Sequence, residues 1–156
     1  MGFPIKKVLI VEDSVLFRDL IRLVLNSLGV EEVVEADDGH QALEILKTFA
    51  AGMVVMDWMM PGMDGIECTQ RIRWASRCNR EVPIVMVSCR DGTTDIQKAI
   101  ESGVNSYVVK PTSATRLLAG FLAAIPAPVT HSRTLTSSPD SVSGAMPINI
   151  GGQELC

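Results

Sequence analysis

Short apolar runs alternate with helix-like stretches five times along the first 125 residues of this 156-residue chain. Short apolar runs predict buried strands, and the stretches between them show the apolar spacing of helices. Alternation of the two is typical of βαβ units, whose right-handed crossovers build one parallel sheet. The predicted strands are 7–11, 32–36, 53–57, 83–88 and 106–109, and the predicted helices lie near 14–28, 39–50, 65–75, 94–102 and 113–125.

Composition narrows the classes of function. The chain is 47% hydrophobic with a net charge of −4, which indicates a globular domain and argues against a general nucleic-acid binder. No apolar run approaches membrane-spanning length, and the first residues lack the apolar stretch of a signal peptide. We therefore expect a cytoplasmic protein that contacts neither membranes nor nucleic acid directly. The absence of a CxxC pair predicts free thiols at Cys68, Cys78, Cys89 and Cys156.

The composition changes after residue 125. Pro126 and Pro128 interrupt the last predicted helix, and residues 130–143 are rich in Ser, Thr and Pro. Such a segment has no periodic apolar face to bury. We expect one domain over residues 1–125, followed by a flexible tail or a truncated linker over residues 126–156.

Polar side chains stand at the ends of four predicted strands. Glu12 and Asp13 follow the first strand, Asp57 ends the third, Ser88 ends the fourth, and Lys110 follows the fifth. In a sheet of order 2-1-3-4-5 these ends share one edge, and the first and third strands flank the topological switch point where such sheets bind ligands. The sequence therefore predicts that these side chains form one site.

The residue types in this predicted site suit phosphoryl transfer. Three carboxylates at close range repel one another and require a cation. Oxygen ligands without His favour Mg²⁺, with Mn²⁺ as an alternative. Asp57 can then act as a nucleophile and form an aspartyl phosphate, while Lys110 and Ser88 contact the phosphoryl oxygens. Asp64 is interpreted as a helix cap rather than a ligand.

Four motifs at these strand ends point to a known family. They are VLIVEDS at 8–14, MDWMMPGMDG at 56–65, VMVS at 85–88 and YVVKP at 107–111. Together they resemble the receiver domain of two-component response regulators, over about residues 5–125. The resemblance implies an α/β, flavodoxin-like, three-layer (βα)5 fold whose parallel five-stranded sheet has the order 2-1-3-4-5. It also implies a signalling protein that is not an enzyme beyond catalysing its own phosphorylation and dephosphorylation.

The resemblance implies a role for each residue around the metal. Asp57 is expected to be the phosphoacceptor and a ligand of Mg²⁺. Asp13 is expected to bind the metal directly, and Glu12 directly or through water. The backbone carbonyl of Met59 is expected to complete the protein ligands.

The resemblance also implies a switch. Ser88 and Lys110 are expected to hold the phosphoryl group, and Tyr107 is expected to swing inward when Ser88 shifts. The output surface would then consist of the last two predicted helices and the strand between them.

The partners implied by the resemblance are proteins. The phosphoryl donor would be a sensor histidine kinase or a histidine phosphotransfer protein, and the target an unidentified downstream protein. The chain would be a monomer or a phosphorylation-dependent dimer. We expect a stand-alone receiver; the alternative is a receiver fragment of a larger regulator whose output domain follows the linker.

Several residues near Asp57 depart from the commonest family pattern. Met59 and Arg90 occupy positions that influence the lifetime of the phosphoryl group in similar proteins. Because the apolar side chain of Met59 cannot orient a water by hydrogen bonding, we predict a phosphorylated state that lasts minutes rather than seconds. Cys89 stands where a small Ala is usual, and Trp58 is expected to form a solvent-facing lid over the site.

Two other interpretations fit the sequence less well than a phosphorylatable switch. An aspartyl-phosphate hydrolase of the haloacid dehalogenase kind requires a second Asp two residues after the nucleophile, where this chain has Met59. A receiver-like scaffold that no longer accepts phosphate is disfavoured by the intact set of Asp13, Asp57, Ser88 and Lys110.

Overall fold

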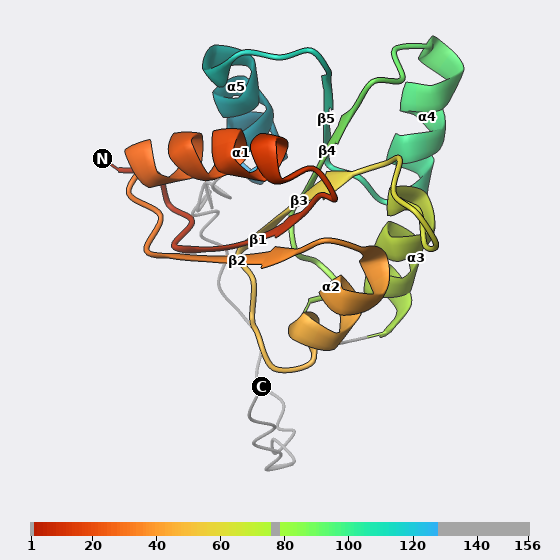
Figure 1. Cartoon of the computed structure of the whole chain (residues 1–156), viewed down its shortest axis with the longest axis horizontal. Helices are drawn as coiled ribbons and strands as arrows, with labels where there is room; N and C mark the ends of the chain where they lie inside the picture. Colours follow the sequence, from red (N-terminus) through yellow and green to blue (C-terminus); the bar gives the residue numbers. More distant parts are fainter. Residues whose placement is uncertain (1, 76–78, 128–156) are drawn as a thin grey trace, which may run out of the picture. The chain divides into compact units, whose positions relative to one another are not determined.

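A computed structural model describes residues 2–75 and 79–127 of the chain (Figure 1). In these residues five parallel strands form one sheet of order β2-β1-β3-β4-β5. The predicted fold class and strand order are therefore confirmed. The elements in chain order are β1 (Lys7–Val11), α1 (Val15–Ser27), β2 (Glu32–Ala36), α2 (Gly39–Leu46), β3 (Met53–Asp57), α3 (Gly65–Ala75), β4 (Ile84–Ser88), α4 (Thr93–Ser102), β5 (Ser106–Val109) and α5 (Ala114–Ala124).

Helices cover both faces of the sheet, with α1 and α5 on one face and α2, α3 and α4 on the other (Figure 1). Side chains alternate between the two layers because successive residues of a strand point to opposite faces. In β1, for example, Leu9 packs toward α2 and α3, whereas Ile10 packs toward α1 and α5. The central strands β3 and β4 are buried at every position, as expected for a parallel sheet covered on both sides.

The predicted element boundaries differ from the structure by one residue at most, except at the end of α2. The helix predicted over 39–50 ends at Leu46, and the Asn79 side chain donates a hydrogen bond of 2.8 Å to the Leu46 carbonyl at this end. The strand predicted from Pro83 begins at Ile84, since a proline has no N–H for the ladder. These two differences lie away from the carboxyl ends of the strands.

A glycine fixes the turn that carries Asp57. The N–H of Gly65 donates to the carbonyl of Trp58 at 2.9 Å, and a Cβ added at Gly65 would lie 2.2 Å from the Asp57 carbonyl oxygen. Only glycine allows helix α3 to begin so close to the end of β3. The loop between them is therefore held tightly against the sheet edge.

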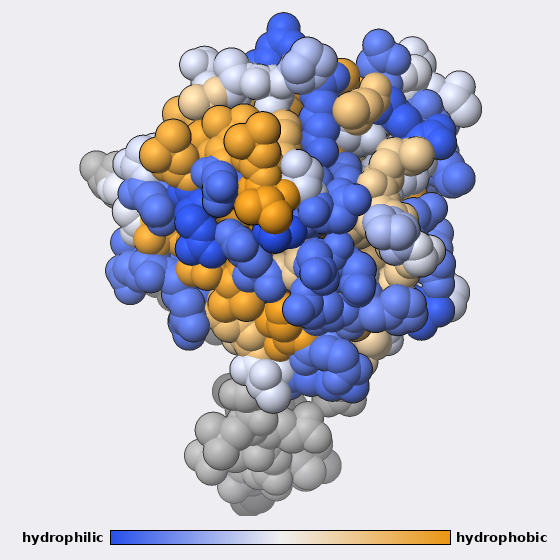
Figure 2. Space-filling view, viewed as in Figure 1, coloured by the Kyte–Doolittle hydropathy of each residue, from blue (hydrophilic) through white to orange (hydrophobic). Residues whose placement is uncertain are grey.

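The surface over α1 and α5 carries apolar side chains (Figure 2). Leu16 and Leu23 on α1 are 81% and 68% exposed, and Leu122 on α5 is 53% exposed. Ser14 caps α1, because its Oγ accepts a hydrogen bond from the N–H of Phe17 at 3.4 Å. In the described part of the chain no helix combines the length and apolarity needed to cross a membrane.

Some predictions concern residues that the structure does not describe. Nearly all of the segment 126–156 lies outside the described residues, as do Cys78 and Cys156. The other two cysteines are free thiols: Cys68 is buried and Cys89 is exposed.

Candidate functional site

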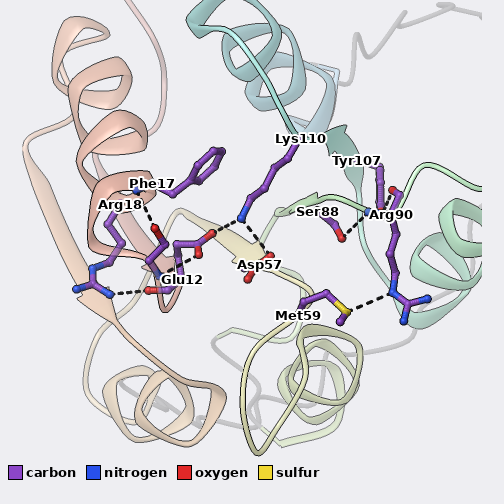
Figure 3. Close-up of polar contacts among 10 residues, drawn as sticks. Glu12, Phe17, Arg18, Asp57, Met59, Ser88, Arg90, Tyr107 and Lys110 are labelled. Carbon is purple, nitrogen blue, oxygen red and sulfur yellow. Dashed lines mark hydrogen bonds and ion pairs between the residues drawn. The ribbon is translucent and has the colours of Figure 1, made fainter.

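The predicted acidic residues meet at the carboxyl edge of the sheet. Figure 3 shows two of them, Glu12 and Asp57. The parallel register places Val11 of β1 opposite Met56 of β3, so the residues that follow in each chain segment share one edge. One carboxylate oxygen from each of Glu12, Asp13 and Asp57 lies within 4.8 Å of the others. Hard oxygen donors at this spacing are the ligand set that Mg²⁺ prefers.

Lys110 joins this acidic cluster from the end of β5 (Figure 3). Its Nζ lies 2.7 Å from Glu12 Oε2 and 3.3 Å from Asp57 Oδ1. The Lys110 side chain is only 14% exposed, so its charge acts on the two carboxylates with little screening by water. The ammonium therefore lies where a group bonded to Asp57 would also contact it.

Burial shapes the charges of this cluster. Glu12 and Asp57 are 1% and 5% exposed, and burial raises the pKa of both carboxyl groups, an effect that Lys110 partly offsets. Burial also opposes the charged form of Lys110. Its hydrogen bond to Glu12 and the charges of the two carboxylates outweigh that effect, so the pKa of Lys110 is raised. The carboxylates and the lysine thus hold opposite charges at short range in a poorly solvated site.

Glu12 is the most firmly held of the three acids. Its Oε1 accepts a hydrogen bond from the N–H of Ser14 at 3.1 Å, while its Oε2 accepts from Lys110. Arg18 donates to the backbone carbonyl of Glu12 at 2.6 Å and also pairs with Glu35 at 3.2 Å. Asp13, by contrast, is exposed.

Ser88 and Tyr107 both bond to the backbone of Arg90, in the loop between β4 and α4 (Figure 3). The buried Ser88 hydroxyl accepts from the N–H of Arg90 at 3.2 Å. The Tyr107 hydroxyl donates to the Arg90 carbonyl at 2.8 Å. A change at Ser88 can therefore reach Tyr107 through a single loop residue.

The prediction that Trp58 forms a solvent-facing lid is wrong. Trp58 is only 3% exposed and packs edge-to-face against Tyr107, with ring centroids 6.4 Å apart. The guanidinium of Arg90 lies over the Trp58 ring at 5.0 Å from its centroid, and Lys98 Nζ lies over it at 5.9 Å. Cationic side chains attracted to the ring face therefore cover it.

The side chain of Arg90 also contacts two residues besides Trp58, namely Met59 and Asp95. Its Nε lies 3.3 Å from Met59 Sδ (Figure 3). Its Nη1 lies 3.2 Å from Asp95 Oδ1. Met59 is 56% exposed, which places its side chain at the entrance rather than in the core. Asp64, as predicted, is a helix cap that accepts from the N–H of Glu67 at 2.8 Å.

Two residues of the site were not found from the sequence. Arg18 supports Glu12, and the ring of Phe17 lies 4.1 Å from Lys110 Nζ. Both belong to the first turns of α1, where the sequence shows only a helical apolar pattern. No local signal marks either one, because their contacts depend on segments distant along the chain.

Comparison with known proteins identifies the family. Residues 8–121 match the family model of the response regulator receiver domain.

The chain belongs to this family.

Chemotaxis proteins are among the relatives of this receiver domain. It is 39% identical over 106 residues to chemotaxis protein CheY1 of Helicobacter pylori, an alignment that covers 67% of this chain and 85% of that protein. It is 40% identical over 111 residues to CheY-3 of Vibrio cholerae, with 71% and 85% covered. The chain is thus a chemotaxis-regulator-like receiver domain, a class of signalling proteins rather than classical enzymes.

Comparison with solved structures also identifies a receiver domain. The chemotaxis response regulator CheY4 of Vibrio cholerae superimposes with a TM-score of 0.72 at 28% identity, covering 78% of this chain and 99% of that one. The receiver domain of the sensor histidine kinase PA1611 from Pseudomonas aeruginosa superimposes with a TM-score of 0.66 at 29% identity, covering 78% and 95%. That structure has a magnesium ion coordinated in its active site cleft.

Proposed function

We propose that this receiver domain is a phosphorylation-dependent switch whose phosphoacceptor is Asp57. The observation that carries the proposal is the meeting of Glu12, Asp13 and Asp57 within 4.8 Å, with the Lys110 ammonium 3.3 Å from Asp57. The donor is a sensor histidine kinase or a histidine phosphotransfer protein. An Asp57 carboxylate oxygen attacks phosphorus, the P–N bond of the donor's phosphohistidine breaks, and the imidazole leaves with the electron pair.

The metal site of this proposal uses oxygen atoms only. Asp13, Asp57 and the backbone carbonyl of Met59 would hold Mg²⁺ or Mn²⁺, with Glu12 binding directly or through water. Both Glu12 oxygens already accept hydrogen bonds, which favours the contact through water. The bound cation supplies charge neutralisation as negative charge gathers at Asp57.

Lys110 and Ser88 would hold the phosphoryl oxygens. The Lys110 ammonium is already within reach of Asp57, and Ser88 ends the neighbouring strand β4. Ser88 would turn its hydroxyl proton toward the phosphoryl group and give up the hydrogen bond that it accepts from Arg90. Tyr107, which donates to the same loop residue, would then move and change the surface of α4, β5 and α5.

The remaining parts of the proposal concern the chain as a whole. We propose a cytoplasmic, stand-alone receiver over residues 1–125 that catalyses only its own phosphorylation and dephosphorylation. The alternative is a receiver fragment of a larger regulator. The downstream target is a protein that binds the surface of α4, β5 and α5. The receiver presents this surface as a monomer or as a phosphorylation-dependent dimer.

Incubation with Mg²⁺ and acetyl phosphate tests this function. Mass spectrometry should find one added phosphoryl group in the native chain and none in Asp57→Asn or when EDTA is present. A phosphoryl group retained in Asp57→Asn would overturn the assignment of the acceptor. Sustained release of phosphate from many phosphate esters would instead favour the hydrolase interpretation.

A further inference from the structure

The Lys110 ammonium has an uncharged neighbour besides its two carboxylates. Its Nζ lies over the ring of Phe17, 4.1 Å from the ring centroid (Figure 3). This is well within the range in which the negative face of an aromatic ring attracts a cation. Phe17 comes from the first turn of α1, whereas Lys110 follows β5, so the fold itself creates the contact.

The position of the Phe17 ring is fixed from two sides. The N–H of Phe17 donates to Ser14 Oγ, the cap of α1, which holds its backbone in the first helical turn. The half-buried ring packs against the apolar layer formed with α1 and α5. The ring is therefore a preformed wall beside the lysine.

The three neighbours of Lys110 respond differently to a cation in the acidic cluster. Glu12 and Asp57 attract the ammonium through their negative charge, and a divalent cation at these carboxylates would neutralise that charge. The attraction of the ring face does not depend on the carboxylates. The relative importance of Phe17 in holding Lys110 is therefore greatest when the site is loaded with metal.

We propose that Phe17 is a positioning residue that keeps the Lys110 ammonium beside Asp57 for contact with the phosphoryl group. Without the ring, the ammonium would be hydrated and mobile once the carboxylates bind a cation. It would then lose more freedom on contacting a phosphoryl oxygen. This inference rests on the proposed function of Asp57.

Fluorinated phenylalanines at position 17 test the inference with little change of shape. Successive ring fluorines weaken the negative potential of the ring face, so the affinity for beryllofluoride at saturating Mg²⁺ should fall stepwise. Calorimetry of the full chain should show a total loss of about fivefold to 30-fold. The affinity for Mg²⁺ alone should remain at the native value, because Phe17 donates no ligand atom.

Two controls separate positioning from a structural role. In a Lys110→Met background, the same fluorinated series should leave beryllofluoride affinity unchanged, because no cation remains to face the ring. In the metal-free protein, the ring current of Phe17 should shift the proton resonances of the Lys110 ε-methylene upfield. Phe17→Leu should remove that shift.

The outcomes distinguish this inference from the proposed function. Suppose that native protein binds beryllofluoride but that ring fluorination leaves this affinity unchanged, or that the ring-current shift is absent. Phe17 then does not position Lys110, and the proposed function of Asp57 stands. If the native protein binds no beryllofluoride at saturating Mg²⁺, the proposed function fails, and the inference fails with it.

Discussion

The site divides at Asp57 into two halves whose construction differs. In one half, side chains from strand ends face each other through short charge contacts. In the other half, side chains gather around the Trp58 ring, with the Arg90 guanidinium over its face and Tyr107 at its edge. The acidic half consists of Glu12, Asp13, Asp57 and Lys110, and the arginine half consists of Trp58, Met59, Arg90 and Tyr107.

In the proposed function, the two halves of the site are built for different tasks: the acidic half for phosphorylation, and the arginine half for its duration and readout. The acidic half is anchored by the register of β1, β3, β4 and β5. Its Glu12, Asp57 and Lys110 side chains, unlike the exposed Asp13, are largely buried. The arginine half depends on Arg90, an exposed residue that contacts the Trp58 ring, the Met59 sulfur and Asp95. We therefore expect substitutions in the acidic half to remove phosphorylation, and those in the arginine half to alter its duration and readout.

Lys110→Met should have the largest effect. It removes the charge that would face the phosphoryl oxygens, and loss of one such group lowers rates by about 10²-fold to 10³-fold. The rate of phosphorylation by acetyl phosphate, followed by mass spectrometry, should fall accordingly. The matched control is Lys98→Met, which removes a lysine that lies over the Trp58 ring of the arginine half and should react at nearly the native rate. Equal losses in both variants would contradict the division of the site.

The acidic half is also the part that the sequence predicted well. Asp57 ends β3 and Lys110 directly follows β5. The strand order of a parallel sheet places the carboxyl ends of these strands together. Trp58 was misplaced because its burial depends on packing in the core and against Tyr107, with Arg90 and Lys98 over its ring, and these contacts come from segments distant along the chain. Phe17 was missed for the same reason, since nothing in α1 indicates where a lysine after β5 will lie.

Met59→Asn should have the next largest effect, and it should shorten the lifetime of the phosphorylated state. An amide at this position can orient an attacking water, and one hydrogen bond is worth about 0.5–1.5 kcal/mol, or roughly twofold to 13-fold in rate. After removal of the phosphoryl donor, the variant should lose its phosphoryl group faster than the native chain. Met59→Leu is the matched control and should keep the native rate. An unchanged rate in Met59→Asn would show that the arginine half does not set the lifetime.

Asp57→Asn should stabilise the metal-free protein. The raised pKa of Asp57 means that burial disfavours its charged form, so removing the charge should increase the free energy of unfolding by about 1 kcal/mol at pH 7. Urea unfolding in EDTA measures this gain. Asp19→Asn, at an exposed position of α1, is the control and should change little.

The gain from Asp57→Asn should depend on pH with a defined sign. A raised folded-state pKa means that the native protein loses stability as pH rises through that pKa, whereas the Asn variant does not. The difference should therefore be largest above the raised pKa and smallest below 3.8, the ordinary value for Asp. A gain that grows toward low pH would contradict the electrostatic explanation.

Fluorescence quenching should show the smallest effect of these predictions, but it tests the arginine half most directly. The chain has two tryptophans: Trp58 is 3% exposed and Trp74 is 89% exposed. In Trp74→Phe, the remaining emission should resist quenching by acrylamide, because Arg90, Lys98 and Tyr107 surround the Trp58 ring. In Trp58→Phe, the emission should be quenched readily. If both variants were quenched alike, Trp58 would be the open lid that its sequence position suggested. Arg90 would then not close this side of the site, and the contrast between the two halves would rest on the acidic cluster alone.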